Sequence, residues 1–158
     1  AERYNPETTG HQMELESEQD VRIAYILFMV NEVELAQQLL RYLGPSDSAL
    51  VHVDAKGTNE TFQAMQQWAS EHTGIFVVQH WAINRVCYSA AAALVDALEI
   101  AVTQLPAWDL AIYLSPNDQP IRPRSELARY LWYHRVNFAQ SDEGQSLRGA
   151  FMLGYECA

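Results

Sequence analysis

Lysine is almost missing from this sequence. Lys56 is the only one among 158 residues, and the formal net charge is −10. Residues 1–20 hold six acidic residues against one arginine, a net charge of −5 and half of the total. Because nonspecific nucleic-acid binding needs clustered lysine and arginine, this balance argues against a nucleic-acid polymer as partner. The acidic stretch lacks apolar periodicity, so we predict a flexible leader over residues 1–20.

Long apolar runs and cysteine clusters are also missing. No run reaches the roughly 18 residues that a membrane-spanning helix needs. The two cysteines, Cys87 and Cys157, form neither a CxxC pair nor a metal-binding cluster. We expect Cys87 to be a buried thiol rather than a nucleophile. The chain starts with Ala and shows no signal peptide, so we expect the natural protein to begin upstream.

Short apolar runs alternate with helical stripes over the rest of the chain, and apolar content of 49% suits one soluble domain. Apolar runs predict strands at residues 21–30, 49–53, 75–78 and 110–114, with a short one at 136–138. Asn31, Thr58 or Asn59, and Ser89 are expected to cap the starts of three helices, and a fourth helix is expected over residues 126–133. This order predicts an α/β fold with a mostly parallel sheet flanked by helices.

The second expected strand ends in His52-Val53-Asp54. A carboxylate at a strand end can accept hydrogen bonds from a nucleotide base or ribose. Asp54 can equally open the loop and cap the residues after it, and its position alone favours that structural role. No third metal ligand stands near His52 and Asp54 at a motif spacing, so a metal site is not predicted.

Turn-forming residues crowd the end of the fourth expected strand, over residues 115–120. Ligands bind past the carboxyl ends of strands in open α/β sheets, so Asp118 is a candidate for sugar hydroxyls. An Asx-type turn before Pro120 explains the same residue equally well. The sequence has no DxD pair, which would have suggested a divalent cation on a diphosphate.

Residues 84–89 precede the long third helix. The N–H groups of a helix start attract anions, and Arg85 adds a charge-assisted donor for phosphate. The segment has no glycine, so its backbone cannot approach a phosphate as a glycine-rich loop does. We therefore favour a structural connection here.

In their order and spacing, these segments resemble the Core-2/I-branching glycosyltransferase family, and most closely its peptide O-xylosyltransferase branch. The similarity covers residues 21–158 and is carried by His52-Val53-Asp54, the Ser89 helix, Trp108-Asp109, Leu114-Ser115…Asp118-Gln119-Pro120 and Tyr155-Glu156-Cys157. Two departures stand out. The family's Trp-Gly-Gly before the helix serine is replaced by residues 85–88, and the aromatic between Asp118 and Pro120 is replaced by Gln119.

The resemblance implies a Rossmann-like glycosyltransferase A-type (GT-A) fold, truncated here, with residues 21–158 as the nucleotide-sugar-binding part. It implies an inverting, metal-independent transfer without cofactors, from a UDP-sugar to a protein or glycan hydroxyl, the sugar being xylose or N-acetylglucosamine. The substrate-binding residues by analogy are Val30, Asp54, Ser89, Ser115, Asp118 and Glu156. The catalytic base is expected beyond Ala158.

The resemblance also implies a place in the Golgi or secretory-pathway lumen. The chain would there be part of a type II membrane protein whose N-terminal anchor is absent from this sequence. The triplet Asn59-Glu60-Thr61 is a glycosylation sequon and permits such a location. The alternative is a noncatalytic α/β module that binds a nucleotide or sugar and is inactive as a truncated chain.

Overall fold

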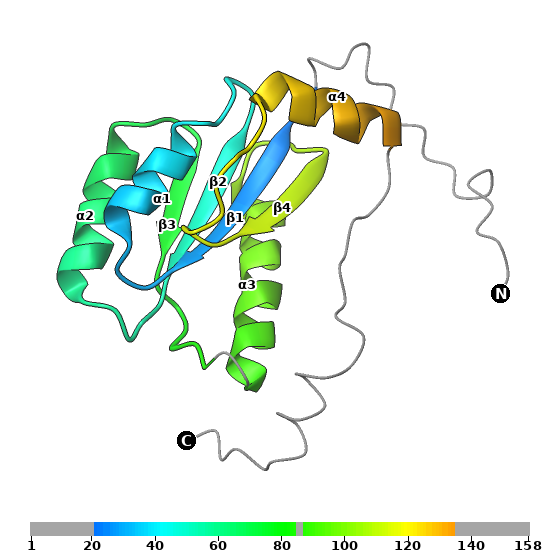
Figure 1. Ribbon diagram of the computed structural model, residues 1–158. Coiled ribbons are helices and arrows are strands. Elements are labelled where there is room, and N and C mark those ends of the chain that lie inside the picture. Colours follow the sequence, from blue (N-terminus) through cyan, green and yellow to red (C-terminus); the bar gives the residue numbers. More distant parts are fainter. Residues whose placement is uncertain (1–20, 85–86, 135–158) are drawn as a thin grey trace, which may run out of the picture.

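The computed structural model describes residues 21–84 and 87–134. Strands and helices alternate along this part of the chain (Figure 1). In order they are β1 (Ile23–Met29), α1 (Val33–Leu40), β2 (Ser48–Val53), α2 (Asn59–Ser70), β3 (Ile75–Val78), α3 (Tyr88–Gln104), β4 (Leu110–Leu114) and α4 (Arg124–His134). The predicted α/β class is confirmed. The leader, the strand expected at residues 136–138 and Glu156 lie outside the described residues.

The four strands form one parallel sheet in the order β3-β2-β1-β4. Leu27 of β1 pairs with Val51 on one side and with Leu114 on the other. Because all strands run the same way, the loops that follow them meet at one edge, called here the carboxyl edge. The chain crosses from β3 to β4 past two strands, so the strand order reverses beside β1. Such a reversal is where ligands bind in open α/β sheets.

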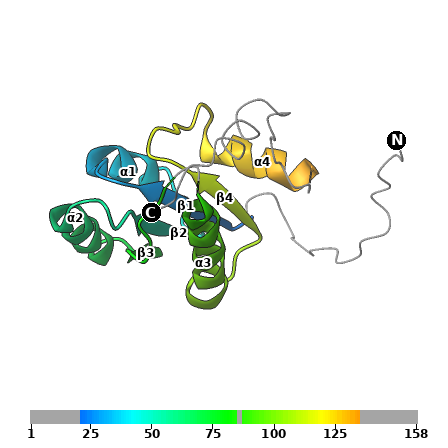
Figure 2. The same ribbon diagram turned by 90° about the horizontal axis from the view of Figure 1, so that it is seen from below.

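Helices cover both faces of the sheet (Figure 2). The larger core cluster joins β1 and β2 to α1, α2 and α4, whereas α3 packs on the opposite face. On that face the contact is made by small residues, with Ala97 and Ala101 fully buried against Ile26 and Leu50. Burial from both sides explains why β1 is a nearly unbroken apolar run. No helix of the described residues is long and apolar enough to span a membrane.

Three of the four predicted helix starts need correction, and Thr58 alone caps as expected, accepting a hydrogen bond from the Thr61 N–H. α1 begins after Glu32, not Asn31, and the Glu32 carboxylate accepts the N–H of Val30 at 3.0 Å instead of capping the helix. α3 begins one residue before Ser89, after Cys87. α4 begins at Arg124, two residues before the expected Glu126. The polar residues in the sequence therefore predicted where the turns lie, but not which groups these residues would hydrogen-bond to.

Candidate functional site

Asp54 lies at the end of β2 and is buried. Its Oδ1 accepts two backbone hydrogen bonds, from Lys56 N at 2.8 Å and from Ile83 N at 3.2 Å. The first bond shapes the loop after β2, and the second fastens the segment after β3 to it. Asp54 therefore performs the structural role that its position favoured, and it holds two loops of the carboxyl edge together.

His52, in β2, makes a further hydrogen bond to the segment after β3. It is fully buried, and its Nε2 accepts the backbone N–H of Trp81 at 3.2 Å. Burial lowers the pKa of His52, so the ring is neutral at pH 7 and its lone pair is free to accept this bond. Among the described residues, no three His, Cys, Asp or Glu side chains are placed to hold a metal ion.

Lys56 and Gly57, which follow Asp54 in the chain, also hold the loops of the carboxyl edge together. The Lys56 ammonium donates to the Ile83 carbonyl oxygen and, at 2.9 Å, to Asn84 Oδ1. Gly57 passes so close to the loop after β1 that an added Cβ would lie 2.6 Å from the Val30 carbonyl oxygen. Sequence reasoning missed both residues. The only lysine of the chain, placed two residues after a strand-end aspartate, was the available signal.

Ser89 joins this cluster through its hydroxyl, which accepts the N–H of Asn84 at 2.9 Å. Lys56 holds the side chain of the same asparagine. Hydrogen bonds therefore connect the loops that carry Asp54, Lys56 and Ser89, and Gly57 brings the loop at Val30 close to them. These five residues are called here the Asp54 cluster. Cys87, which lies between Asn84 and Ser89, is disulfide-bonded, so the expectation of a buried thiol is wrong.

Asp118 lies in the loop after β4. Its Oδ2 accepts the Ser115 N–H at 2.6 Å and the Ser115 hydroxyl at 3.0 Å. The Asp118 carboxylate thus reaches back across a turn that Asp118 N closes on the Ser115 carbonyl at 3.0 Å. The Asx-type turn expected before Pro120 is not formed, because its donor would be the N–H two residues on and Pro120 has none. Pairing of Leu27 with Leu114 places the turn beside the loop after β1. Among the described residues, no hydrogen bond joins Asp118 to the Asp54 cluster.

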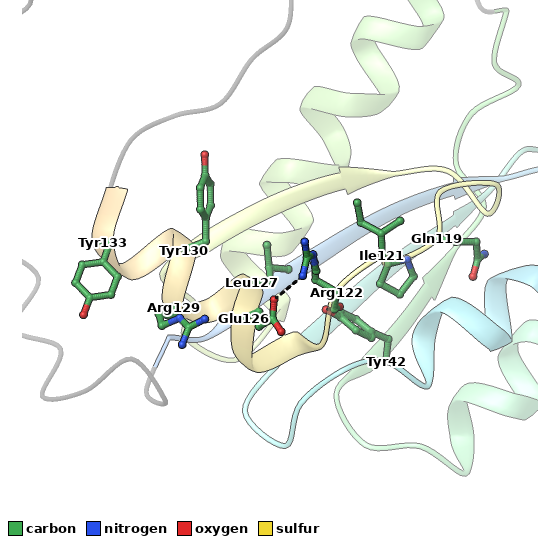
Figure 3. A pocket seen from close by; sticks show the side chains of 10 residues that line it. Tyr42, Gln119, Ile121, Arg122, Glu126, Leu127, Arg129, Tyr130 and Tyr133 are labelled. Atoms are coloured by element: carbon green, nitrogen blue, oxygen red, sulfur yellow. Dashed lines mark hydrogen bonds and ion pairs between the residues drawn. The ribbon is translucent and has the colours of Figure 1, made fainter.

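A cavity of about 780 Å³ lies between α4 and residues 119–122 (Figure 3). Arg122 and Glu126 face each other there with an Nη1–Oε2 distance of 3.5 Å, and the Tyr42 hydroxyl donates to the Arg122 carbonyl at 2.5 Å. Tyr130 and Tyr133, also in the lining, point in different directions in Figure 3. Polar groups therefore do not converge on one point, as they would in a site for a small ligand.

The sheet and its loops together define a class of protein. An open parallel sheet, with buried polar residues that fix the loops at its carboxyl edge beside a reversal of strand order, is the architecture of α/β proteins that bind nucleotides. The chain belongs to the Core-2/I-branching enzyme family, whose sequence model matches residues 23–150. This is a glycosyltransferase family, with a nucleotide-sugar donor and an acceptor as substrates. No curated protein matches the sequence significantly.

Proposed function

We propose that this chain is the donor-binding part of an inverting, metal-independent glycosyltransferase of the secretory pathway, most similar to the xylosyltransferase branch. The donor is a UDP-sugar carrying xylose or N-acetylglucosamine, and the acceptor is a protein or glycan hydroxyl. One observation carries the proposal. Asp54, a buried carboxylate at the carboxyl edge, has its Oδ1 fixed by two backbone N–H groups.

A fixed Oδ1 also fixes the direction of Oδ2, because the carboxylate is planar. In the proposed complex Oδ2 accepts a ribose hydroxyl, a charge-assisted hydrogen bond stronger than a neutral one. The uracil ring lies against the loop at Val30, where Gly57 allows the backbones of the two loops to approach each other closely. The turn of Ser115 and Asp118 lies on the sugar side, and Glu156 is assigned to substrate binding by the family resemblance alone.

The proposed reaction forms a bond between the acceptor oxygen and the anomeric carbon and breaks the bond from that carbon to the UDP oxygen. A carboxylate base takes the acceptor proton, and positive charge stabilises the leaving diphosphate. Asp118 holds Ser115 through two hydrogen bonds, and the Lys56 ammonium holds Ile83 and Asn84. Because both groups are engaged in holding loops, we place the base and the diphosphate clamp beyond the described residues.

A noncatalytic nucleotide- or sugar-binding module is the second candidate. The observation in its favour is that Asp54, Ser89 and Asp118 each accept a hydrogen bond from a backbone N–H of the protein. The replacement of Trp-Gly-Gly by residues 85–88 points the same way. A module of this kind would keep the loops and bind a ligand without transferring a sugar.

Calorimetry with UDP, UDP-xylose and UDP-N-acetylglucosamine, each with and without EDTA, tests the proposal. We expect binding that EDTA leaves unchanged. Asp54→Asn keeps the Oδ1 acceptor and lowers affinity modestly, whereas Asp54→Ala also releases Lys56 N and Ile83 N and lowers it further. With UDP alone, Asp118→Asn is the matched control, because it makes the same change in the turn that the proposal places on the sugar side, outside the Asp54 cluster. Absence of binding by the folded chain would refute the proposal, and binding lost with EDTA would refute metal independence.

A further inference from the structure

Asn59, the first residue of α2, stands at the acceptor position of the only Asn-X-Ser or Asn-X-Thr triplet in the sequence. The middle residue, Glu60, is not proline, so the triplet has the composition that N-glycosylation requires. A glycan is bulky and must lie on the surface. A folded chain therefore accommodates one only where the asparagine side chain faces solvent and no other group depends on it.

The Asn59 side chain meets both conditions. Asn59 is exposed, and in the part of the chain that the structure describes its side chain takes part in no hydrogen bond. The start of α2 does not depend on it either, because Thr58 caps this helix by accepting the N–H of Thr61 at 3.2 Å. A glycan attached to the Asn59 amide would therefore displace no contact of the fold.

The face of α2 that carries Asn59 is polar and uncharged. The opposite face is buried through Met65, which packs in the larger core cluster. Gln63, Gln66 and Ser70 follow Asn59 at spacings of four, seven and eleven residues, which place them on its side of the helix, and all three are exposed. Their amide and hydroxyl groups can hydrogen-bond to sugar hydroxyls. A glycan lying over this face would cover no charged side chain of the stripe and so would pay no cost for burying a charge.

Thr61, which completes the triplet, lies inside the fold. It is buried, and its hydroxyl lies 3.2 Å from the Thr58 hydroxyl oxygen and donates to Asn31 Oδ1 at 3.3 Å. The triplet is recognised through this hydroxyl as well as through the asparagine. Because the folded chain encloses the hydroxyl, glycosylation has to precede the docking of α2. This order is the one followed by chains that are glycosylated while they enter the secretory pathway.

We propose that Asn59 is an N-glycosylation site, an inference that rests on the secretory location in the proposed function. The Asn59 amide nitrogen forms a bond to the anomeric carbon of an oligosaccharide carried on a lipid diphosphate. The bond from that carbon to the diphosphate oxygen breaks, and the lipid diphosphate leaves with the electron pair. The amide nitrogen gives up one proton to a base of the transferring enzyme.

The disulfide at Cys87 is consistent with the same compartment. Disulfides form and persist in the oxidising lumen of the secretory pathway and are rare in the reducing cytosol. A chain that keeps Cys87 oxidised is therefore in the compartment where Asn-X-Thr triplets are glycosylated.

A glycan on Asn59 would leave the β4 end of the carboxyl edge open. α2 lies on the β3 side of the molecule in both views (Figures 1 and 2). The strand order β3-β2-β1-β4 places β4, and the turn of Ser115 and Asp118 that follows it, at the other edge of the sheet as described. The glycan and the sugar side of the proposed donor site are therefore separated by β2 and β1. We expect UDP to bind equally well with and without the glycan.

Secretion of the 158-residue chain from a eukaryotic cell, through an added signal peptide, tests the proposal. We expect peptide-N-glycosidase to increase the electrophoretic mobility of the secreted chain and to leave aspartate at position 59 in peptide maps. Asn59→Gln should abolish the mobility shift, whereas Thr61→Ser keeps the triplet and should retain it. Asn117→Gln is the matched control, because it makes the same change at an exposed asparagine outside any triplet, and it should also retain the shift.

A secreted chain without a glycan would overturn the proposal, as would a mobility shift that persists in Asn59→Gln. Calorimetry with UDP, before and after enzymatic release of the glycan, separates this result from donor binding. A glycosylated chain that binds no UDP in either form would overturn the proposed donor site and leave the glycan assigned. An unglycosylated chain that binds UDP would overturn the glycan alone. Stronger UDP binding after release would contradict the placement of the glycan away from the site.

Discussion

Asp47 and Arg124 form a two-pronged ion pair at the edge of the sheet opposite the carboxyl edge. Arg124 Nη2 lies 2.6 Å from Asp47 Oδ1, and Nε lies 2.9 Å from Oδ2. The same carboxylate accepts the N–H of Ile23 at 3.0 Å and of Gly44 at 2.8 Å. Arg124 also donates to the Val21 carbonyl. One buried pair therefore connects the start of β1, the loop before β2 and the start of α4.

Removal of Arg124 is expected to be strongly destabilising. Arg124→Ala leaves the Asp47 side chain, which is fully buried, with two backbone donors but no counter-charge. Breaking a buried pair on one side costs about 3–5 kcal/mol. Urea denaturation should show a loss of unfolding free energy in this range, and a loss below about 1 kcal/mol would contradict the interpretation.

Arg122→Ala is the control for this prediction. Arg122 and Glu126 also form an ion pair, but both side chains are exposed and their N–O distance is 3.5 Å. Arg122 precedes α4, and exposed ion pairs of this kind contribute about 0.2–1 kcal/mol. The two arginines are two residues apart in sequence, so the comparison isolates burial from the loss of charge.

The order of strands and helices could be predicted because it depends on local patterns. Residues 75–78 and 110–114 were placed at the bounds that the structure shows, as short apolar runs between turn residues. The Asp47–Arg124 pair could not be predicted in this way. Its partners are 77 residues apart, and neither belongs to a motif. Only the paired parallel strands bring them together.

The residues of the candidate site likewise fall into those that local sequence patterns predict and those that depend on contacts between distant segments. Asp54 and Asp118 were found because strand ends in a parallel sheet meet at one edge. Gly57 was missed because its importance comes from the Val30 carbonyl, which belongs to another loop. Leu35 of α1 is exposed, and the helix buries the small Ala36 beside Leu39 and Leu40.

Gly57→Ala is expected to disturb the Asp54 cluster. The added Cβ would lie 2.6 Å from the Val30 carbonyl oxygen and 3.0 Å from that of Asp54, so the two loops must separate. Such overpacking costs about 1–3 kcal/mol. We expect a lower thermal midpoint together with weaker UDP binding by calorimetry. An unchanged thermal midpoint together with an unchanged UDP affinity would contradict the prediction, because the two loops would then accommodate the added methyl group.

Acid is expected to destabilise the fold through His52. Burial lowers the pKa of this residue, whereas in the unfolded chain the pKa has its ordinary value near 6.5. As the pH falls below about 6.5, the unfolded state binds a proton that the folded state does not. The contribution of neutral His52 to stability is therefore present above pH 6.5 and is lost as the pH falls through the lowered pKa.

His52→Gln tests this pH dependence, because glutamine keeps an acceptor for the Trp81 N–H and does not titrate in this range. Urea midpoints at pH 7.5 and 5.5 should differ less in this variant than in the unsubstituted chain. His72→Gln, an exposed position next to the end of α2, is the control and should behave like the unsubstituted chain. Equal pH dependence in all three proteins would mean that the proton is taken up elsewhere. If only His52→Gln shows a smaller pH dependence of the urea midpoint, the acid sensitivity comes from His52. Its bond to Trp81 N lies next to the bond from Ile83 N to Asp54 in the segment after β3.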